Sequence, residues 1–359
     1  PSRHFLTDSD NADLHSNEQQ SERAIIAVNG DFANSRHNLQ LNLPTGCCFN
    51  TQQSYWSFCI GIISMRTFQS QQLYVWVLGA SMGLMSTATF SALAEQSAEP
   101  NNLQVYMQQV IGQQGLGNSE QYRHYKNVNE LNRVSAWIRE QMRVFGIPCQ
   151  YQNYVVNQQS YRNVVCKLNV GSAKKTIFGA HYDVYGQQQG ANDNASGVAG
   201  VIETARILAQ EKNKLSQNVE FVFYTLAEPP FFKTESMGSF VHAKSVQAEK
   251  EKISAVYVLD MIGYYDSNLV QNYPIGIKWI YPSHGNFIAA LSNIQSREVS
   301  AAYCNAMQRL NQLQCERVVA PTFIKGIDFS DHLNYWKYDI PAILITDTGS
   351  YRSSLRHTT

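Results

Sequence analysis

Charged residues are scarce in this sequence, and neither sign of charge is in excess. They make up 16% of the 359 residues, and 28 lysines and arginines balance 28 aspartates and glutamates. Proteins that hold nucleic acid electrostatically carry a basic excess, so the composition argues against nucleic acid as a partner. Hydrophobic residues make up 44% of the chain, which excludes global disorder and allows a packed core.

An apolar run long enough to cross a membrane is also missing. The mostly apolar stretch at residues 73–85 is shorter than the ~20 residues that a bilayer core requires. It follows the positive start Met65-Arg66 and precedes a small-x-small sequence at residues 92–94. This order predicts a signal peptide at residues 65–94, and a secreted or periplasmic protein without a stable membrane anchor after cleavage. Met65 is then the expected start, and residues 1–64 are expected to be a non-native or untranslated upstream segment.

Cysteines are few, and three of the seven lie in the upstream segment. The other four lie in the part predicted to fold: Cys149, Cys166, Cys304 and Cys315. The first two flank a predicted hairpin, and the last two flank the end of a predicted helix, so both pairings fit an oxidising compartment. Four cysteines allow three connectivities, and four buried free thiols are a further alternative.

Strands alternate with helices along the rest of the chain. A Gln/Asn-rich N-terminal arm at residues 95–118 precedes a helix predicted at residues 120–145 by the spacing of its apolar residues. Strands are then expected at residues 151–156, 161–168, 176–180, 219–226, 253–259 and 342–346, and helices at residues 197–210, 238–248, 286–294, 297–313 and 330–338. The alternation predicts an α/β fold whose largely parallel sheet is covered by helices on both faces.

Side chains that can bind a metal follow these strands, at the edge where α/β sheets place their chemistry. They are His181 and Asp183 after the third strand, Asp193 in the next loop, Glu228 and Asp260 after two later strands, and His332 before the last helix. Each alone is commonly a turn or helix-cap residue, but their consistent placement at strand ends is harder to explain in that way. Imidazoles and carboxylates without thiolates suit zinc in an open catalytic site. A carboxylate shared by two ions is the two-metal arrangement used in hydrolysis.

Residues 160–348 resemble the secreted zinc-dependent aminopeptidases, di-zinc exopeptidases that include bacterial leucyl aminopeptidases and, more distantly, glutaminyl cyclases. The matching blocks are GAHYDVYG, GANDNASGVAG, FVFYTLAEPP followed by MGS, VLDMIGYYD and SDHLNYWKYDIPAILITDT. The resemblance implies a zinc exopeptidase domain at residues 119–352, with a mixed sheet of about eight strands sandwiched between helices. It also implies hydrolysis of the N-terminal peptide bond of peptides with a free N-terminus.

The resemblance implies two zinc ions per chain and a role for each candidate residue. His181 and Asp260 would hold one zinc, Glu228 and His332 would hold the other, and Asp193 would bridge the two. Asp183 would orient the imidazole of His181, as carboxylates do for many metal-bound histidines.

Two departures from the family pattern bear on activity. Family members carry two adjacent glutamates after the central strand, the first a general base and the second a ligand, and Ala227 stands in the first place here. An alternative takes Glu228 as the base and Glu235 as the ligand, although the rigid prolines at residues 229–230 argue against it. The resemblance also ends near Arg352, so residues 353–359 are interpreted as a polar tail outside a domain truncated at its C-terminus.

Three functions therefore compete. The first is a di-zinc aminopeptidase, which the ANDNASG loop and the two-metal pattern favour. The second is a glutaminyl-peptide cyclotransferase-like enzyme, which would use one zinc. The third is a catalytically silent protein that binds zinc and peptides, and Ala227 favours it.

Overall fold

The structure is a computed structural model that describes residues 98–112, 122–273, 278–311, 313–353 and 357. These residues belong to one of two compact units, residues 47–359. The predicted signal peptide and the segment upstream of it lie outside the described residues. In the part that is described, no helix combines the length and the apolar character needed to cross a bilayer.

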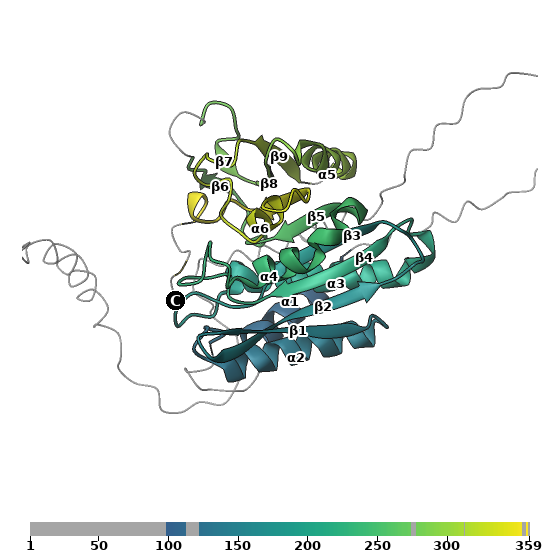
Figure 1. Cartoon of the computed structure of the whole chain (residues 1–359). Coiled ribbons are helices and arrows are strands. Elements are labelled where there is room, and N and C mark those ends of the chain that lie inside the picture. Colours follow the sequence, from purple (N-terminus) through teal and green to yellow (C-terminus); the bar gives the residue numbers. More distant parts are fainter. Residues whose placement is uncertain (1–97, 113–121, 274–277, 312, 354–356, 358–359) are drawn as a thin grey trace, which may run out of the picture. The chain divides into compact units, whose positions relative to one another are not determined.

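Eight strands form one mixed sheet, which confirms the predicted α/β class and strand number (Figure 1). In spatial order they are β1 (Cys149–Val156), β2 (Gln159–Leu168), β4 (Asn218–Tyr224), β3 (Lys175–His181), β5 (Ile253–Leu259), β10 (Ala342–Thr346), β8 (Phe287–Ser292) and β9 (Gln314–Val319). The central strands β4, β3, β5 and β10 run parallel, whereas β8 is antiparallel to β10. The short strands β6 (Asp266–Val270) and β7 (His284–Gly285) pair separately.

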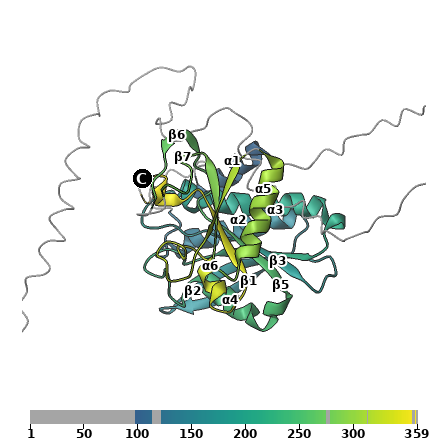
Figure 2. The same ribbon diagram turned by 90° about the horizontal axis from the view of Figure 1, so that it is seen from above.

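Helices cover both faces of this sheet because side chains alternate along each strand. The α-helices of the described residues are α1 (Pro100–Ile111), α2 (Val128–Val144), α3 (Gly197–Gln210), α4 (Gly238–Val246), α5 (Arg297–Leu310) and α6 (His332–Trp336). In β3, Phe178 and Ala180 join the core beneath α1, α2, α3 and α5, whereas Ile177 joins the core beneath α4 and α6. Figure 2 shows α3 and α5 on one side of the strands and α4 and α6 on the other.

One expectation about the elements was wrong, and one segment holds a helix that the sequence did not predict. Residues 286–294 do not form a helix but hold strand β8, whose FIAALS sequence is almost entirely buried. A short apolar run of this kind has no alternation that separates a buried strand from a helix. The N-terminal arm also contains a helix, because Leu103, Tyr106 and Val110 of α1 enter the core beside α3.

Both cysteine pairs are joined. Cys149 and Cys166 are directly opposite each other in the β1–β2 ladder and form a disulfide. Cys304 of α5 is bonded to Cys315 of β9. Both disulfides between neighbouring elements are therefore present, and the alternative of four free thiols is wrong.

Candidate metal centre

Three adjacent parallel strands deliver the site residues to one edge of the sheet. His181 is the last residue of β3, and Asp260 follows directly after the last residue of β5. Glu228 lies four residues beyond the end of β4, which pairs with β3 on its other side. Asp193 lies in the segment Ala191–Ser196, which leads into α3 and whose backbone is non-helical at Asp193 itself.

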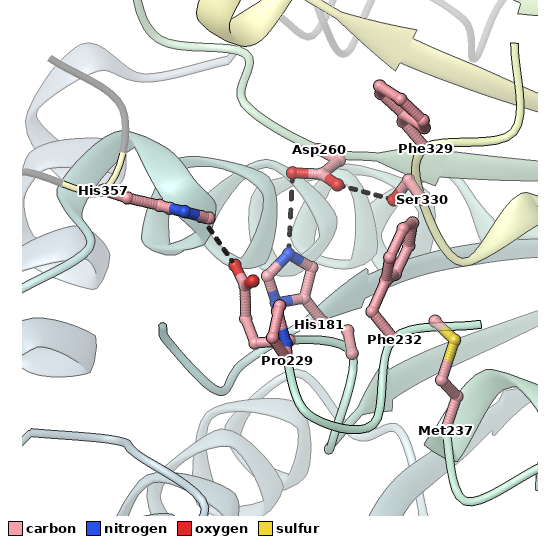
Figure 3. Close-up of a pocket in the computed structure, with 10 residues that line it drawn as sticks. His181, Pro229, Phe232, Met237, Asp260, Phe329, Ser330 and His357 are labelled. Carbon is pink, nitrogen blue, oxygen red and sulfur yellow. Dashed lines mark hydrogen bonds and ion pairs between the residues drawn. The ribbon is translucent and has the colours of Figure 1, made fainter. Parts of the chain in front are cut away.

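The first group of possible ligands is His181, Asp193 and Asp260. Nε2 of His181 lies 3.5 Å from Oδ1 of Asp193 and 3.5 Å from Oδ1 of Asp260. All three side chains are buried. Figure 3 shows the imidazole of His181 directed at the carboxylate of Asp260 inside the pocket.

The second group shares Asp193 with the first. Nε2 of His357 lies 3.2 Å from Oδ2 of Asp193 and 3.4 Å from Oε1 of Glu228. One ligand atom from each of these residues falls within 4.8 Å of the others. The two oxygens of Asp193 thus face two different imidazoles, as a bridging carboxylate would.

Asp183 supports both groups from behind. Its carboxylate accepts hydrogen bonds of 3.1 Å from the backbone N–H groups of Ala227 and Glu228. Nδ1 of His181 lies 3.1 Å from the backbone carbonyl of Asp183 and 3.6 Å from its Oδ1. If Nδ1 donates its proton there, the lone pair of Nε2 faces the carboxylates of Asp193 and Asp260, and this arrangement favours a cation between them.

The electrostatics of the site also favour positive charge at this place. Burial and the nearby charge of Asp193 raise the pKa of Glu228 to about 7. Contacts with Asp193 and Glu228 raise the pKa of His357 to about 9. Oδ1 of Asp260 is buried and makes no hydrogen bond to any described residue. Buried carboxylates need a positive partner, and this mixed imidazole–carboxylate set fits zinc.

His332 does not join either group, which corrects the prediction that it is a ligand. Its ring is fully buried, with Nε2 2.7 Å from the carbonyl oxygen of Ile327 and the ring perpendicular to that of Trp336. Burial lowers the pKa of His332 to about 4. As the first residue of α6, it points into the core, and the preceding Ser330 reaches the site instead, donating a 2.5 Å hydrogen bond to Oδ2 of Asp260.

A cavity of about 160 Å³ opens beside these residues. Its lining comprises His181, Ala227, Glu228, Pro229, Phe232, Met237, Asp260, Phe329, Ser330 and His357. Figure 3 shows Phe232, Met237 and Phe329 on the side away from His357, so this wall is apolar. Glu235, the alternative ligand, is exposed and belongs to neither group.

Comparison with known families decides the class of this fold. The profile of peptidase family M28 matches residues 163–359, more than half of the chain. The chain belongs to peptidase family M28. The M28 match includes residues 353–359, the segment that was interpreted as a tail outside the family.

Two curated relatives cover different shares of the chain. The uncharacterized protein YfbL of Escherichia coli is 42% identical over 245 residues, which are 64% of this chain and 73% of YfbL. The probable lipoprotein aminopeptidase LpqL of Mycobacterium tuberculosis is 32% identical over 121 residues, which are 32% of this chain and 23% of LpqL.

Solved structures share the M28 fold at low sequence identity. The LapA aminopeptidase of Legionella pneumophila is 17% identical, with a TM-score of 0.56 over 72% of this chain. The match covers 64% of the LapA chain, slightly less than two thirds of its length. The glutaminyl cyclase of Porphyromonas gingivalis is 17% identical, with a TM-score of 0.51 over 69% of this chain and 84% of the cyclase chain. These likenesses show the fold alone.

The site residue that sequence reasoning missed is His357. It lies beyond the last strand, in residues 353–359, which were interpreted as a tail outside the family. The available signal was the presence of a histidine in this short segment. The SDH block at residues 330–332, inside the region of resemblance, offered another histidine for the same role.

Proposed function

We propose that this M28 protein holds two zinc ions and acts on the N-terminal peptide bond of peptides with a free N-terminus. The observation that carries the proposal is the position of Asp193. Its two oxygens face separate imidazole-containing groups, so one carboxylate can serve two ions. Shared carboxylates of this kind belong to two-metal hydrolytic sites, aminopeptidases included.

The ligand sets follow from the two groups. His181 and Asp260 would hold one zinc together with Asp193, and Glu228 and His357 would hold the other together with Asp193. Bound zinc would polarise the peptide carbonyl and lower the pKa of water towards ~7. Asp183 would keep His181 and the backbone before Glu228 in place, and Ser330 would orient Asp260.

The cavity beside the ligands supports a short peptide terminus as the substrate. One side of it carries the proposed zinc ligands, where bound zinc would help to hold the free amine of an N-terminus. The other side carries Phe232, Met237 and Phe329, which suit an apolar first side chain. A two-ion site also supports peptide hydrolysis over the one-zinc cyclase alternative.

A catalytically silent zinc- and peptide-binding protein is the second candidate, and Ala227 favours it. The methyl group of Ala227 lines the cavity beside Glu228, at the position where the family resemblance places the general base. A methyl group moves no proton, so the protein would bind peptides and turn them over slowly.

Metal stoichiometry tests the proposal directly. The full chain should bind two zinc ions, and Asp193→Asn should weaken both sites because each loses the same bridging ligand. Asp339→Asn is the matched control, since this exposed aspartate pairs only with the surface residue Lys250 among the described residues. One zinc ion per wild-type chain, or full double occupancy of Asp193→Asn, would reject the two-metal assignment.

We also propose that the mature protein is exported after removal of residues 65–94. The two disulfides support an oxidising compartment, because cytosolic thiols are kept reduced. N-terminal sequencing of the protein from its native cells should find a start near residue 95. A mature protein that retains residues 1–64 would contradict this.

A further inference from the structure

One buried guanidinium lies between the N-terminal helix and the loop that connects two of the proposed ligands. The side chain belongs to Arg123, which is 1% exposed. Its Nη1 donates to the carbonyl oxygens of Val110, at 3.3 Å, and Gln189, at 2.7 Å. Nε donates to the carbonyl oxygen of Tyr182 at 2.8 Å, and Nη2 to that of Gly190 at 3.0 Å.

These contacts close a loop that matters to the site. The loop, residues 182–190, begins directly after His181, contains Asp183 and ends three residues before Asp193. Arg123 binds its first residue and its last two, so one fork-shaped group sets the distance between the loop ends. The backbone takes part as well, because the N–H of Val184 donates to the carbonyl oxygen of Arg123 at 3.1 Å.

The end of the loop is tightly fitted against the same side chain. Gly190 has a left-handed φ of 58°. A Cβ atom there would come within 2.4 Å of the carbonyl oxygen of Asp193 and 3.1 Å of Nη2 of Arg123. A side chain at position 190 would therefore displace the chain that leads into Asp193 and crowd Val184 and the guanidinium.

Burying this charge costs free energy, which its hydrogen bonds must offset. Burial lowers the pKa of Arg123 to about 10, so the group is still charged at neutral pH. Its four acceptors are backbone carbonyl oxygens. The guanidinium is therefore hydrogen-bonded to the main chain and not to a charged side chain. Only a planar guanidinium offers donors in this fixed fork, whereas the ammonium of lysine is a point charge.

We propose that Arg123 is a positioning residue for the metal centre: it ties the C-terminal end of α1 to both ends of the loop and so sets the spacing of His181, Asp183 and Asp193. The inference rests on the proposed two-zinc site. It also gives α1, in the segment expected to be an arm, a part in shaping the site.

The test compares Arg123→Lys with Arg133→Lys in the full chain. Arg133 donates to the same helix end, at the carbonyls of Gln109 and Val110, and pairs with Glu130, but it makes no hydrogen bond to residues 182–190 among the described residues. Zinc affinity is measured by competition with a chelator, at a temperature where circular dichroism shows both variants folded. Outer-shell changes typically cost ~10- to 100-fold in metal affinity, and we expect a loss of that size for Arg123→Lys and less than twofold for Arg133→Lys.

The outcomes separate this inference from the proposed function. If the wild-type chain binds no zinc, the proposed function fails first. If both variants bind zinc like the wild type, only the role of Arg123 is rejected, and equal losses in the two variants reject it as well.

A second measurement covers the case in which Arg123→Lys does not fold. Coupling between two sites is reciprocal, so zinc should slow hydrogen exchange at Nε of Arg123 and at the amide of Val184 in the wild-type chain. Nuclear magnetic resonance should show at least a tenfold slowing there, with no change at Nε of Arg133. Equal exchange at Arg123 with zinc and with chelator would overturn the inference.

Discussion

At position 227, a substitution should change the rate of the proposed reaction without changing the binding of zinc or peptide. The proposed ligands His181, Glu228 and Asp260 line the same cavity as Ala227. The backbone N–H of Ala227 donates to Asp183, but its side chain cannot carry a proton. Ala227→Glu should therefore raise kcat on a short peptide by ~10² to 10⁴-fold, the usual worth of general acid–base catalysis. Zinc content and KM should change little, because the substitution adds no ligand. Steady-state kinetics and metal analysis of the two proteins measure this.

Ala227→Gln is the matched control for this substitution. Glutamine has nearly the size of glutamate and cannot accept the proton, so it should leave kcat at the wild-type level. If the glutamate variant is no faster than the wild type, position 227 is not the base position. Glu228 would then be the residue to test next.

Alanine substitutions of the two candidate histidines should have opposite effects on zinc binding and on Tm. His357 is partly exposed and meets Asp193 and Glu228 through Nε2 alone, so His357→Ala should weaken one zinc site with little change in Tm. His332 is fully buried and faces Ile327 and Trp336. His332→Ala should lower Tm and leave two zinc ions bound to the folded protein. Zinc loss from the His332 variant alone would restore the original ligand assignment.

Among the elements, α5 and β9 are held together by the disulfide between Cys304 and Cys315, at a sequence separation of 11 residues. Closing a loop of this size typically contributes ~2 to 4 kcal/mol, mainly by restricting the unfolded chain. Replacing both cysteines with serine should lower the free energy of unfolding by about that amount in a denaturant titration.

The same double variant should keep its zinc content, because neither cysteine lines the cavity or belongs to a ligand group. The other cysteine pair offers a comparison, since β1 and β2 already pair through a full antiparallel ladder around it. A double serine variant at Cys304 and Cys315 as stable as the wild type would show that the α5–β9 contact needs no crosslink.

Strands β1 and β8 also show where pattern reading stops. Strands β1 and β2 were expected as a hairpin, and β1 is partly exposed along its length. Strand β8 lies between β10 and β9 with helices over the sheet, so nearly every side chain is buried and the period is lost. The position of β8 was decided by its partners in the sheet rather than by its own residues.

At the scale of the whole domain, the free energy of unfolding should depend on pH because of Glu220. This buried carboxylate lies 3.2 Å from Nε2 of His242 and 3.1 Å from Nζ of Lys175. Burial alone would raise the pKa of Glu220, but His242 and Lys175 outweigh it and lower the pKa from 4.5 to about 2. The ionised group therefore stabilises the fold above pH 4.5, and this stabilisation is lost as the pH falls from 4.5 to 2.

Glu220→Gln should flatten the pH dependence of the unfolding free energy in that window. At pH 7 it should lower stability by up to roughly 3 kcal/mol, at about 1.4 kcal/mol per pH unit of the pKa difference. Urea titrations at pH 7, 5 and 3 measure it, with the exposed Glu298→Gln as the control. If the unfolding free energy of the variant falls with pH as steeply as that of the wild type, Glu220 does not govern acid unfolding.

The sequence by itself determined the fold class and placed most of the proposed ligands at strand ends, because that information is local. His181 and Asp260 directly follow buried strands, and parallel pairing of those strands carries their side chains to one edge. Local sequence does not determine which of His332 and His357 lies beside the other proposed ligands. Both follow strands or turns in polar sequence, and only the packed chain decides which imidazole turns into the core and which reaches Asp193. Tertiary structure decided this because contacts between residues far apart in the sequence leave no periodic trace in either segment.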